Sequence, residues 1–142
     1  MKNILFSIFI LFTGSSYAQR APTDIELKSE YCIAVLQESL KGQKELSGKI
    51  LESNYSKQLL QKTEQNLNRL RSYLLPRVEE IKLEGLILAS ERARRDRENY
   101  SSCSPQCKDL DTMDKCLEAC SKRIGDPLTR LRSCHDINFL PF

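Results

Sequence analysis

The sequence has few of the residues that mark β-sheets and tight turns. Neither Asn-Gly nor Asp-Gly occurs, so the usual signals for a β-hairpin between alternating runs are missing. The chain holds only five glycines and five prolines, and they fall mostly where helices would end. These absences argue against a sandwich or a barrel. We therefore predict an all-α fold, a small helical bundle with a disulfide-linked C-terminal helical hairpin.

Residues for catalysis are equally scarce. His135 is the only histidine, and no Gly-x-Ser-x-Gly, glycine-rich phosphate loop or His-Glu-x-x-His occurs. A Cys–His nucleophilic pair would need a free thiolate near His135, and its neighbour Cys134 is expected in a disulfide. Glycoside hydrolysis needs only two carboxylates, but most acidic residues here alternate with basic ones on helix surfaces. We predict a non-enzymatic protein with no catalytic residue, no metal site and no cofactor.

The longest apolar run stands at the N-terminus. Lys2 precedes the run Ile4–Phe12, and Ser16-Tyr17-Ala18 places small residues at the −3 and −1 positions of a cleavage site. The run is shorter than the roughly 20 apolar residues of a transmembrane helix. We predict a signal peptide over residues 1–18, an apolar N-terminal strand being the alternative. The mature chain, residues 19–142, is then one secreted or periplasmic helical domain without a transmembrane segment.

The cysteines form a pattern near the C-terminus. Cys103 and Cys107 are four residues apart, as are Cys116 and Cys120, and this spacing places two side chains on one face of a helix. The residues 108–115 between the pairs include three aspartates and one threonine, which favour turns and helix N-caps. The pattern predicts two short antiparallel helices joined by a turn.

The same spacing predicts how the cysteines pair. In such a hairpin Cys103 opposes Cys120 and Cys107 opposes Cys116, since both pairs have their midpoint between residues 111 and 112. The crossed pairing would separate the partners by more than the roughly 4.4–6.8 Å between Cα atoms that a disulfide allows. The remaining bond would be Cys32–Cys134. A four-cysteine zinc site is an alternative, although such sites usually have tighter loops and reduced surroundings. A redox-active pair is another, although those motifs have two intervening residues and this chain has three.

Two partial resemblances rest on these cysteines. The paired Cys-x-x-x-Cys motif of residues 103–120 resembles the twin motif of small mitochondrial intermembrane-space chaperones, but the gap of eight residues is shorter and a cleavable export signal is not their import route. Six cysteines in a secreted helical chain also resemble insect odorant-binding proteins, but only Cys103-x-x-x-Cys107 fits that pattern. Neither resemblance assigns the chain to a family.

Long amphipathic helices are predicted over residues 24–100. Thr23 and Glu26 form a capping-box pattern, and the apolar stripe that follows directs Cys32 toward the core. The stripe is interrupted around Gly42 and resumes with Leu46, Ile50 and Leu51, so residues 24–52 form one helix or two. After a break at 53–56, the clearest helical period in the chain follows. Its members are Leu59, Leu60, Thr63, Leu67, Leu70, Tyr73 and Leu74.

Two further segments shape the rest of the prediction. Pro76 should end or kink a helix, and Val78–Leu88 is apolar on all sides, which predicts a central, buried helix. The charged run Glu91–Glu98 holds four arginines and three acidic residues, which indicates a solvated face with local ion pairs. An anionic glycan, a lipid head group or an acidic protein is the alternative partner for this run.

The C-terminal end continues the helical pattern. Gly125 reads as a helix C-cap, and Asp126-Pro127 as the start of another helix. The apolar tail Phe139–Phe142 is expected to dock on the domain, because Cys134 tethers it. Asn54 and Asn99 each begin an Asn-x-Ser sequon at a predicted helix break, and whether they carry glycans depends on the cell that makes the chain.

These observations favour an interaction protein over an enzyme. We expect an exported non-enzymatic protein that binds another protein, as an inhibitor, a secretion-apparatus accessory, an effector or a periplasmic chaperone. No nucleic-acid partner is expected, and the sequence singles out no binding residue. The alternative is a carrier that encloses a small apolar ligand among its helices. A carrier should have a sizeable apolar cavity, whereas an interaction protein should expose an apolar patch or groove.

Overall fold

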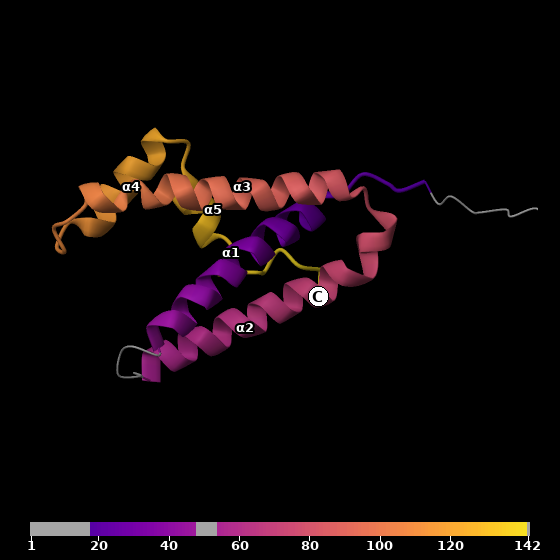
Figure 1. Ribbon diagram of the computed structural model, residues 1–142, viewed down its shortest axis with the longest axis horizontal. Helices are drawn as coiled ribbons and strands as arrows, with labels where there is room; N and C mark the ends of the chain where they lie inside the picture. Colours follow the sequence, from indigo (N-terminus) through magenta and orange to yellow (C-terminus); the bar gives the residue numbers. More distant parts are fainter. Residues whose placement is uncertain (1–17, 48–53, 142) are drawn as a thin grey trace, which may run out of the picture.

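The computed structural model describes residues 18–47 and 54–141, which are mainly helical and contain no strand (Figure 1). The α-helices are α1 (Asp24–Ser47), α2 (Asn54–Leu74), α3 (Leu83–Ser101), α4 (Met113–Arg123) and α5 (Pro127–Arg132). Two short 3-10 helices, η1 (Leu75–Glu80) and η2 (Ser104–Gln106), flank α3. The all-α prediction is confirmed. Within the described ranges, no helix has the length and apolar character needed to cross a membrane.

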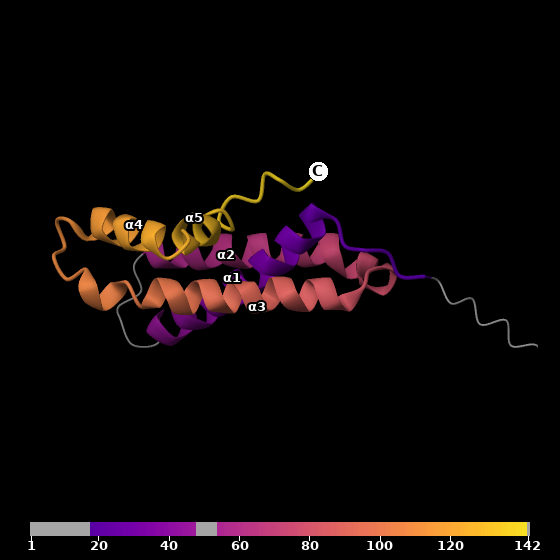
Figure 2. The same cartoon turned by 90° about the horizontal axis from the view of Figure 1, so that it is seen from above.

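The helices enclose one main core. In Figure 1, α1 and α2 lie side by side in opposite directions, and α3 packs across α1. Leu36, Leu70 and Ile81 are fully buried between them. Ile137 and Leu140 are also buried there and Phe139 packs against the same core, so the expected docking of the tail is correct for its described part; Phe142 lies outside the described residues. Figure 2 shows α4 and α5 folded back along the C-terminal end of α3.

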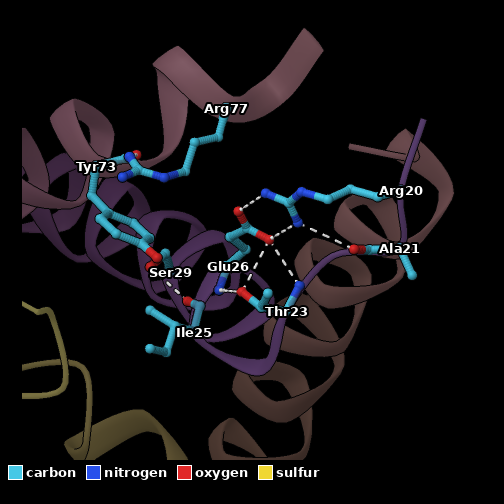
Figure 3. A network of polar contacts seen from close by, with 8 residues as sticks. All are labelled: Arg20, Ala21, Thr23, Ile25, Glu26, Ser29, Tyr73 and Arg77. Carbon is cyan, nitrogen blue, oxygen red and sulfur yellow. Dashed lines mark hydrogen bonds and ion pairs between the residues drawn. The ribbon is translucent and has the colours of Figure 1, made fainter. Parts of the chain in front are cut away.

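A buried polar network fixes the beginning of α1 (Figure 3). The carboxylate of Glu26 accepts a hydrogen bond from the amide of Thr23 at 2.8 Å, and Thr23 Oγ1 accepts one from the amide of Glu26 at 3.3 Å. This reciprocal pair is the predicted capping box. The guanidinium of Arg20 donates two more hydrogen bonds to the same carboxylate, at 2.6 and 2.8 Å. Chiefly because of Arg20, and against the effect of burial, the pKa of Glu26 falls to about 2.

Arg20 also joins the start of α1 to the start of α3. Its amide donates to the carbonyl of Glu80 at 2.9 Å, and its carbonyl accepts from the amide of Lys82 at 2.9 Å. These bonds form a single parallel bridge between Arg20 and Ile81. The backbone therefore pairs with the segment before α3 from the second residue after the predicted cleavage site.

The first two helices follow the sequence pattern. α1 continues through Gly42 to Ser47 without a break. On α2, the buried residues are Thr63, Asn66, Leu67, Leu70, Tyr73 and Leu74. This is the predicted face with Asn66 added, except that Leu59 and Leu60 are only partly buried. The signal peptide, apart from Ala18, and the interpretation of Ile50 and Leu51 lie outside the described residues.

The prediction of one buried helix over Val78–Leu88 is wrong in both boundaries and burial. Residues 75–80 form the 3-10 helix η1, which contains Pro76. Ile81 is extended, with φ −107° and ψ 142°, because it pairs with Arg20. α3 then begins at Leu83 and contacts the core through Leu86, Ala89 and Ala93. The other large apolar residues at the start of α3, Leu83, Ile87 and Leu88, are exposed.

The cysteine hairpin has the predicted bonds but a different first arm. Cys103 pairs with Cys120 and Cys107 with Cys116, with Cα atoms 5.8 and 5.7 Å apart. The third bond, Cys32–Cys134, joins α1 to the tail with Cα atoms 5.0 Å apart. The first arm was expected to be an α-helical turn, yet residues 104–106 form η2 and Cys107 is outside any helix. Pro105 explains this, because it cannot donate a helical hydrogen bond.

The remaining expectations concern helix ends. Gly125 has a φ of 88° and Asp126 a φ of 55°, and Pro127 opens α5, as the sequence predicts. Asn54 begins α2, in agreement with a helix break there. Asn99 does not lie at a break, since α3 continues to Ser101. Both asparagines are exposed.

Candidate binding surface

A groove of about 740 Å³ runs between α1 and α3 and is bounded at one end by α5. It is partly open to solvent. Its lining residues come from all three helices and the segment before α1: Pro22, Asp24, Leu27, Lys28, Tyr31, Gly85, Leu88, Ala89, Arg92, Arg130 and Ser133. Along α3 the lining changes from apolar at Gly85, Leu88 and Ala89 to cationic at Arg92, and we call these the apolar end and the polar end of the groove.

At the apolar end of the groove, the backbone of α3 at Gly85 packs closely against the ring of Pro22. A Cβ atom added at Gly85 would lie 2.6 Å from Cγ of Pro22 and 3.6 Å from Cδ2 of Leu27. Such a distance from Pro22 is shorter than real Cβ contacts allow, so glycine lets α3 approach the start of α1. Leu27 and Leu88 flank this point on the two helices.

A buried carboxylate lies beneath the polar end. Asp96 is only 4% exposed and accepts a hydrogen bond from the hydroxyl of Tyr31 at 2.8 Å. Arg130 donates to the two carboxylate oxygens of Asp96 at 2.6 and 2.7 Å. Burial opposes ionisation, but the hydrogen bonds from Arg130 and Tyr31 outweigh it and lower the pKa of Asp96. Burial and the hydrogen bond to Asp96 raise the pKa of the Tyr31 hydroxyl.

These contacts correct the expectation for the charged run Glu91–Glu98. Arg94 and Glu98 form the expected exposed ion pair, at 2.6 Å. Asp96, however, belongs to the interior, and Arg97 donates to the carbonyl of Val35 on α1 at 3.3 Å. One side of the run thus holds α3 against α1 and α5. Spacing along the chain gave no signal for this, since the partners of Asp96 lie 65 and 34 residues away.

Two cations at the groove have no carboxylate partner among the described residues. Arg92 makes no hydrogen bond or ion pair within those residues, although its charge helps to lower the pKa of Asp96. Lys28 lies over the ring of Phe139, with its Nζ 4.3 Å from the ring centroid. The acidic residue in the lining is Asp24, one turn before Lys28. Three cations, Lys28, Arg92 and Arg130, therefore face one carboxylate, Asp24, in the lining of the groove as a whole.

An exposed apolar band lies on α3 beside the groove. Leu83, Ile87 and Leu88 are 51%, 56% and 54% exposed, and we call these three residues the α3 band. Leu88 also lines the groove, whereas Leu83 and Ile87 do not. All three lie in the segment Val78–Leu88, which the sequence predicts to be buried in the core.

The cysteine hairpin presents a second apolar point. Leu110 is 82% exposed in the turn that the Cys107–Cys116 bond closes. Asp109 holds this turn: its carboxylate accepts from the amide of Asp111 and from the hydroxyl of Thr112, both at 3.1 Å. A single leucine makes a smaller surface than the α3 band.

None of the residues considered for chemistry lines the groove. All six cysteines are in disulfides, so none is a free thiolate that could bind zinc or attack a substrate. His135 is exposed, and partial desolvation together with the charge of Lys62 lowers its pKa. Its carbonyl accepts a hydrogen bond from Asn66 at 3.2 Å. Its side chain has no thiolate beside it, because Cys134 is bonded to Cys32.

Comparison of the chain with protein-family models, curated proteins and solved structures finds no match.

Proposed function

We propose that this chain is an exported, non-enzymatic interaction protein that binds a partner protein through the α3 band. The observation that carries the proposal is the exposure of Leu83, Ile87 and Leu88 within two turns of one helix. Adjacent exposed apolar side chains mark interaction sites. Burying one leucine or isoleucine stabilises a complex by about 1.5–3 kcal/mol in transfer free energy, so a partner that covers the band gains substantially.

Export is the second part of the proposal. Three disulfides in a chain of this size are typical of oxidising compartments. The N-terminal pattern ending at Ala18 supplies a route to such a compartment. A secreted or periplasmic location supports the proposed roles, which are inhibitor, secretion-apparatus accessory, effector or chaperone.

The alternative function is a carrier of a small apolar ligand. The groove beside the α3 band favours it, since its volume lies within the roughly 300–1,000 Å³ of small-molecule sites. The openness of the groove favours the partner protein, because a carrier of a wholly apolar ligand should enclose it.

The test is recovery of a partner from the native compartment after mild crosslinking. Tagged wild-type protein should retain a defined partner, and the double variant Leu83→Ser/Ile87→Ser should lose it. The wild type and the double variant should have the same helical circular dichroism spectrum. Leu110→Ser is the matched control, since it removes an exposed leucine on the hairpin. Retention by the double variant, or loss only with Leu110→Ser, would move the interface away from the α3 band.

A further inference from the structure

We propose that the groove between α1 and α3 binds a small anionic amphiphile, that is, a carboxylate or sulfonate on a hydrocarbon chain. This site shares only Leu88 with the α3 band, because Leu83 and Ile87 do not line the groove. The proposal uses two features of the groove, its apolar end and the sign of charge at its other end.

The apolar end suits a hydrocarbon chain. Its walls are the ring of Pro22, the side chains of Leu27, Leu88 and Ala89, and the backbone at Gly85. From Gly85 to Arg92, α3 rises by about 10 Å at about 1.5 Å per residue. A chain of medium length can therefore lie between these two points with its head group beside Arg92.

The polar end suits an anion. Arg130 is already neutralised by Asp96, so it adds little net charge. Arg92 on α3, together with Lys28 on α1, whose Nζ also lies over the ring of Phe139, then outnumbers the single carboxylate of Asp24 in the lining. The guanidinium of Arg92 has no hydrogen-bond acceptor among the described residues, which leaves its donors for a ligand. A cationic head group would be repelled by these charges, and a neutral head group would lack the charge attraction.

The first experiment compares head groups on one chain. Oxidised mature protein, residues 19–142, is titrated with decanoate, decanol and decyltrimethylammonium below their micelle-forming concentrations, with displacement of a fluorescent fatty acid as the readout. We expect saturable binding of decanoate with one site, and weaker binding of the other two compounds. Absence of saturable decanoate binding, or equal affinities for decanoate and decyltrimethylammonium, would overturn the proposal.

The second experiment locates the site. Arg92→Gln should weaken decanoate binding about tenfold, as expected for the loss of a charge-assisted hydrogen bond, and leave decanol unchanged. Leu88→Ala should weaken both compounds. Arg95→Gln is the matched control, since Arg95 is exposed on the same helix but does not line the groove. Equal decanoate affinities of wild type and Arg92→Gln would show that the head group lies elsewhere.

The Leu83→Ser/Ile87→Ser variant separates this proposal from the partner protein. It should bind decanoate like the wild type even though it loses the partner. Loss of decanoate binding in this variant would assign the ligand to the α3 band and contradict the groove site.

Discussion

Asp96 on α3 and Arg130 on α5 form a two-point ion pair in which Nε of Arg130 donates to Oδ2 at 2.7 Å and Nη2 donates to Oδ1 at 2.6 Å. The hydroxyl of Tyr31 donates to the same carboxylate from α1. A single side chain thus connects three helices beneath the groove. The α3 band and the groove both depend on α3 being held in this position.

Replacing Asp96 by asparagine should destabilise the fold. Removing one partner of a buried ion pair costs about 3–5 kcal/mol, and the one-third exposure of the Arg130 side chain lowers our expectation to about 2–3 kcal/mol. Tyr31→Phe removes only one hydrogen bond and should cost about 1 kcal/mol. Urea unfolding of the oxidised variants measures both. Equal losses in the two variants would show that the ion pair adds nothing to the hydrogen bond.

Glu26 should make stability fall in acid. Its pKa is about 2 in the folded chain and 4.5 as the ordinary value, so the unfolded chain binds the proton more tightly. The stabilisation is therefore complete above about pH 4.5 and disappears as pH falls toward 2. It amounts to at most about 3 kcal/mol, and solvent around Arg20 reduces it.

Unfolding curves from pH 6 to pH 2 measure this effect. Wild type should lose more stability over the range than Glu26→Gln, which has no carboxylate to protonate. Parallel curves for the two proteins would contradict the assigned role of Glu26.

The three disulfides should differ in their effect. Cys32–Cys134 spans 102 residues and Cys107–Cys116 only nine. In the chain-entropy model the long loop contributes about 4–5 kcal/mol and short hairpin loops about 3 kcal/mol or less. Cys32→Ser/Cys134→Ser should remain helical but melt at lower temperature, whereas Cys107→Ser/Cys116→Ser should mainly loosen residues 103–120. Non-reducing peptide mapping checks the pairing, and a peptide linking Cys32 to a hairpin cysteine would refute it.

Two glycines in helices should respond oppositely to alanine. At Gly85 the added Cβ meets Pro22 at 2.6 Å, so Gly85→Ala should cost about 1–3 kcal/mol through overpacking. At Gly42 nothing lies within 4 Å, so Gly42→Ala should stabilise α1 by about 0.5–1 kcal/mol. Thermal melts of the two variants decide this. A stabilising Gly85→Ala would show that α3 does not approach Pro22 closely.

Local chemistry made much of this fold predictable. The cysteine spacing fixed the hairpin because a disulfide tolerates a narrow range of Cα distances. Thr23 and Glu26 predicted the start of α1 because a capping box is a contact between near neighbours. Gly125 predicted the end of α4 because few other residues adopt its positive φ.

The candidate site could not be predicted in the same way. Its main contacts, Tyr31 with Asp96 and Asp96 with Arg130, join residues distant in sequence. The bridge between Arg20 and Ile81 interrupts the run Val78–Leu88, which is apolar on all sides. The helix that follows the bridge therefore exposes the α3 band, although the sequence predicts that it is buried. Apolar composition measures the tendency to be buried, but it does not say whether the chain itself or a partner does the burying.

The most direct test of the central claim is site-specific photo-crosslinking from the α3 band in the intact exporting cell. A photoreactive residue at position 87 of the full chain should give one crosslinked partner, and the same residue at position 95, on the exposed face of α3, should not. Leu83→Ser in the first protein should reduce the yield. Equal crosslinking from positions 87 and 95, or no crosslink to another protein from position 87, would contradict the proposal that the α3 band is the partner-binding surface.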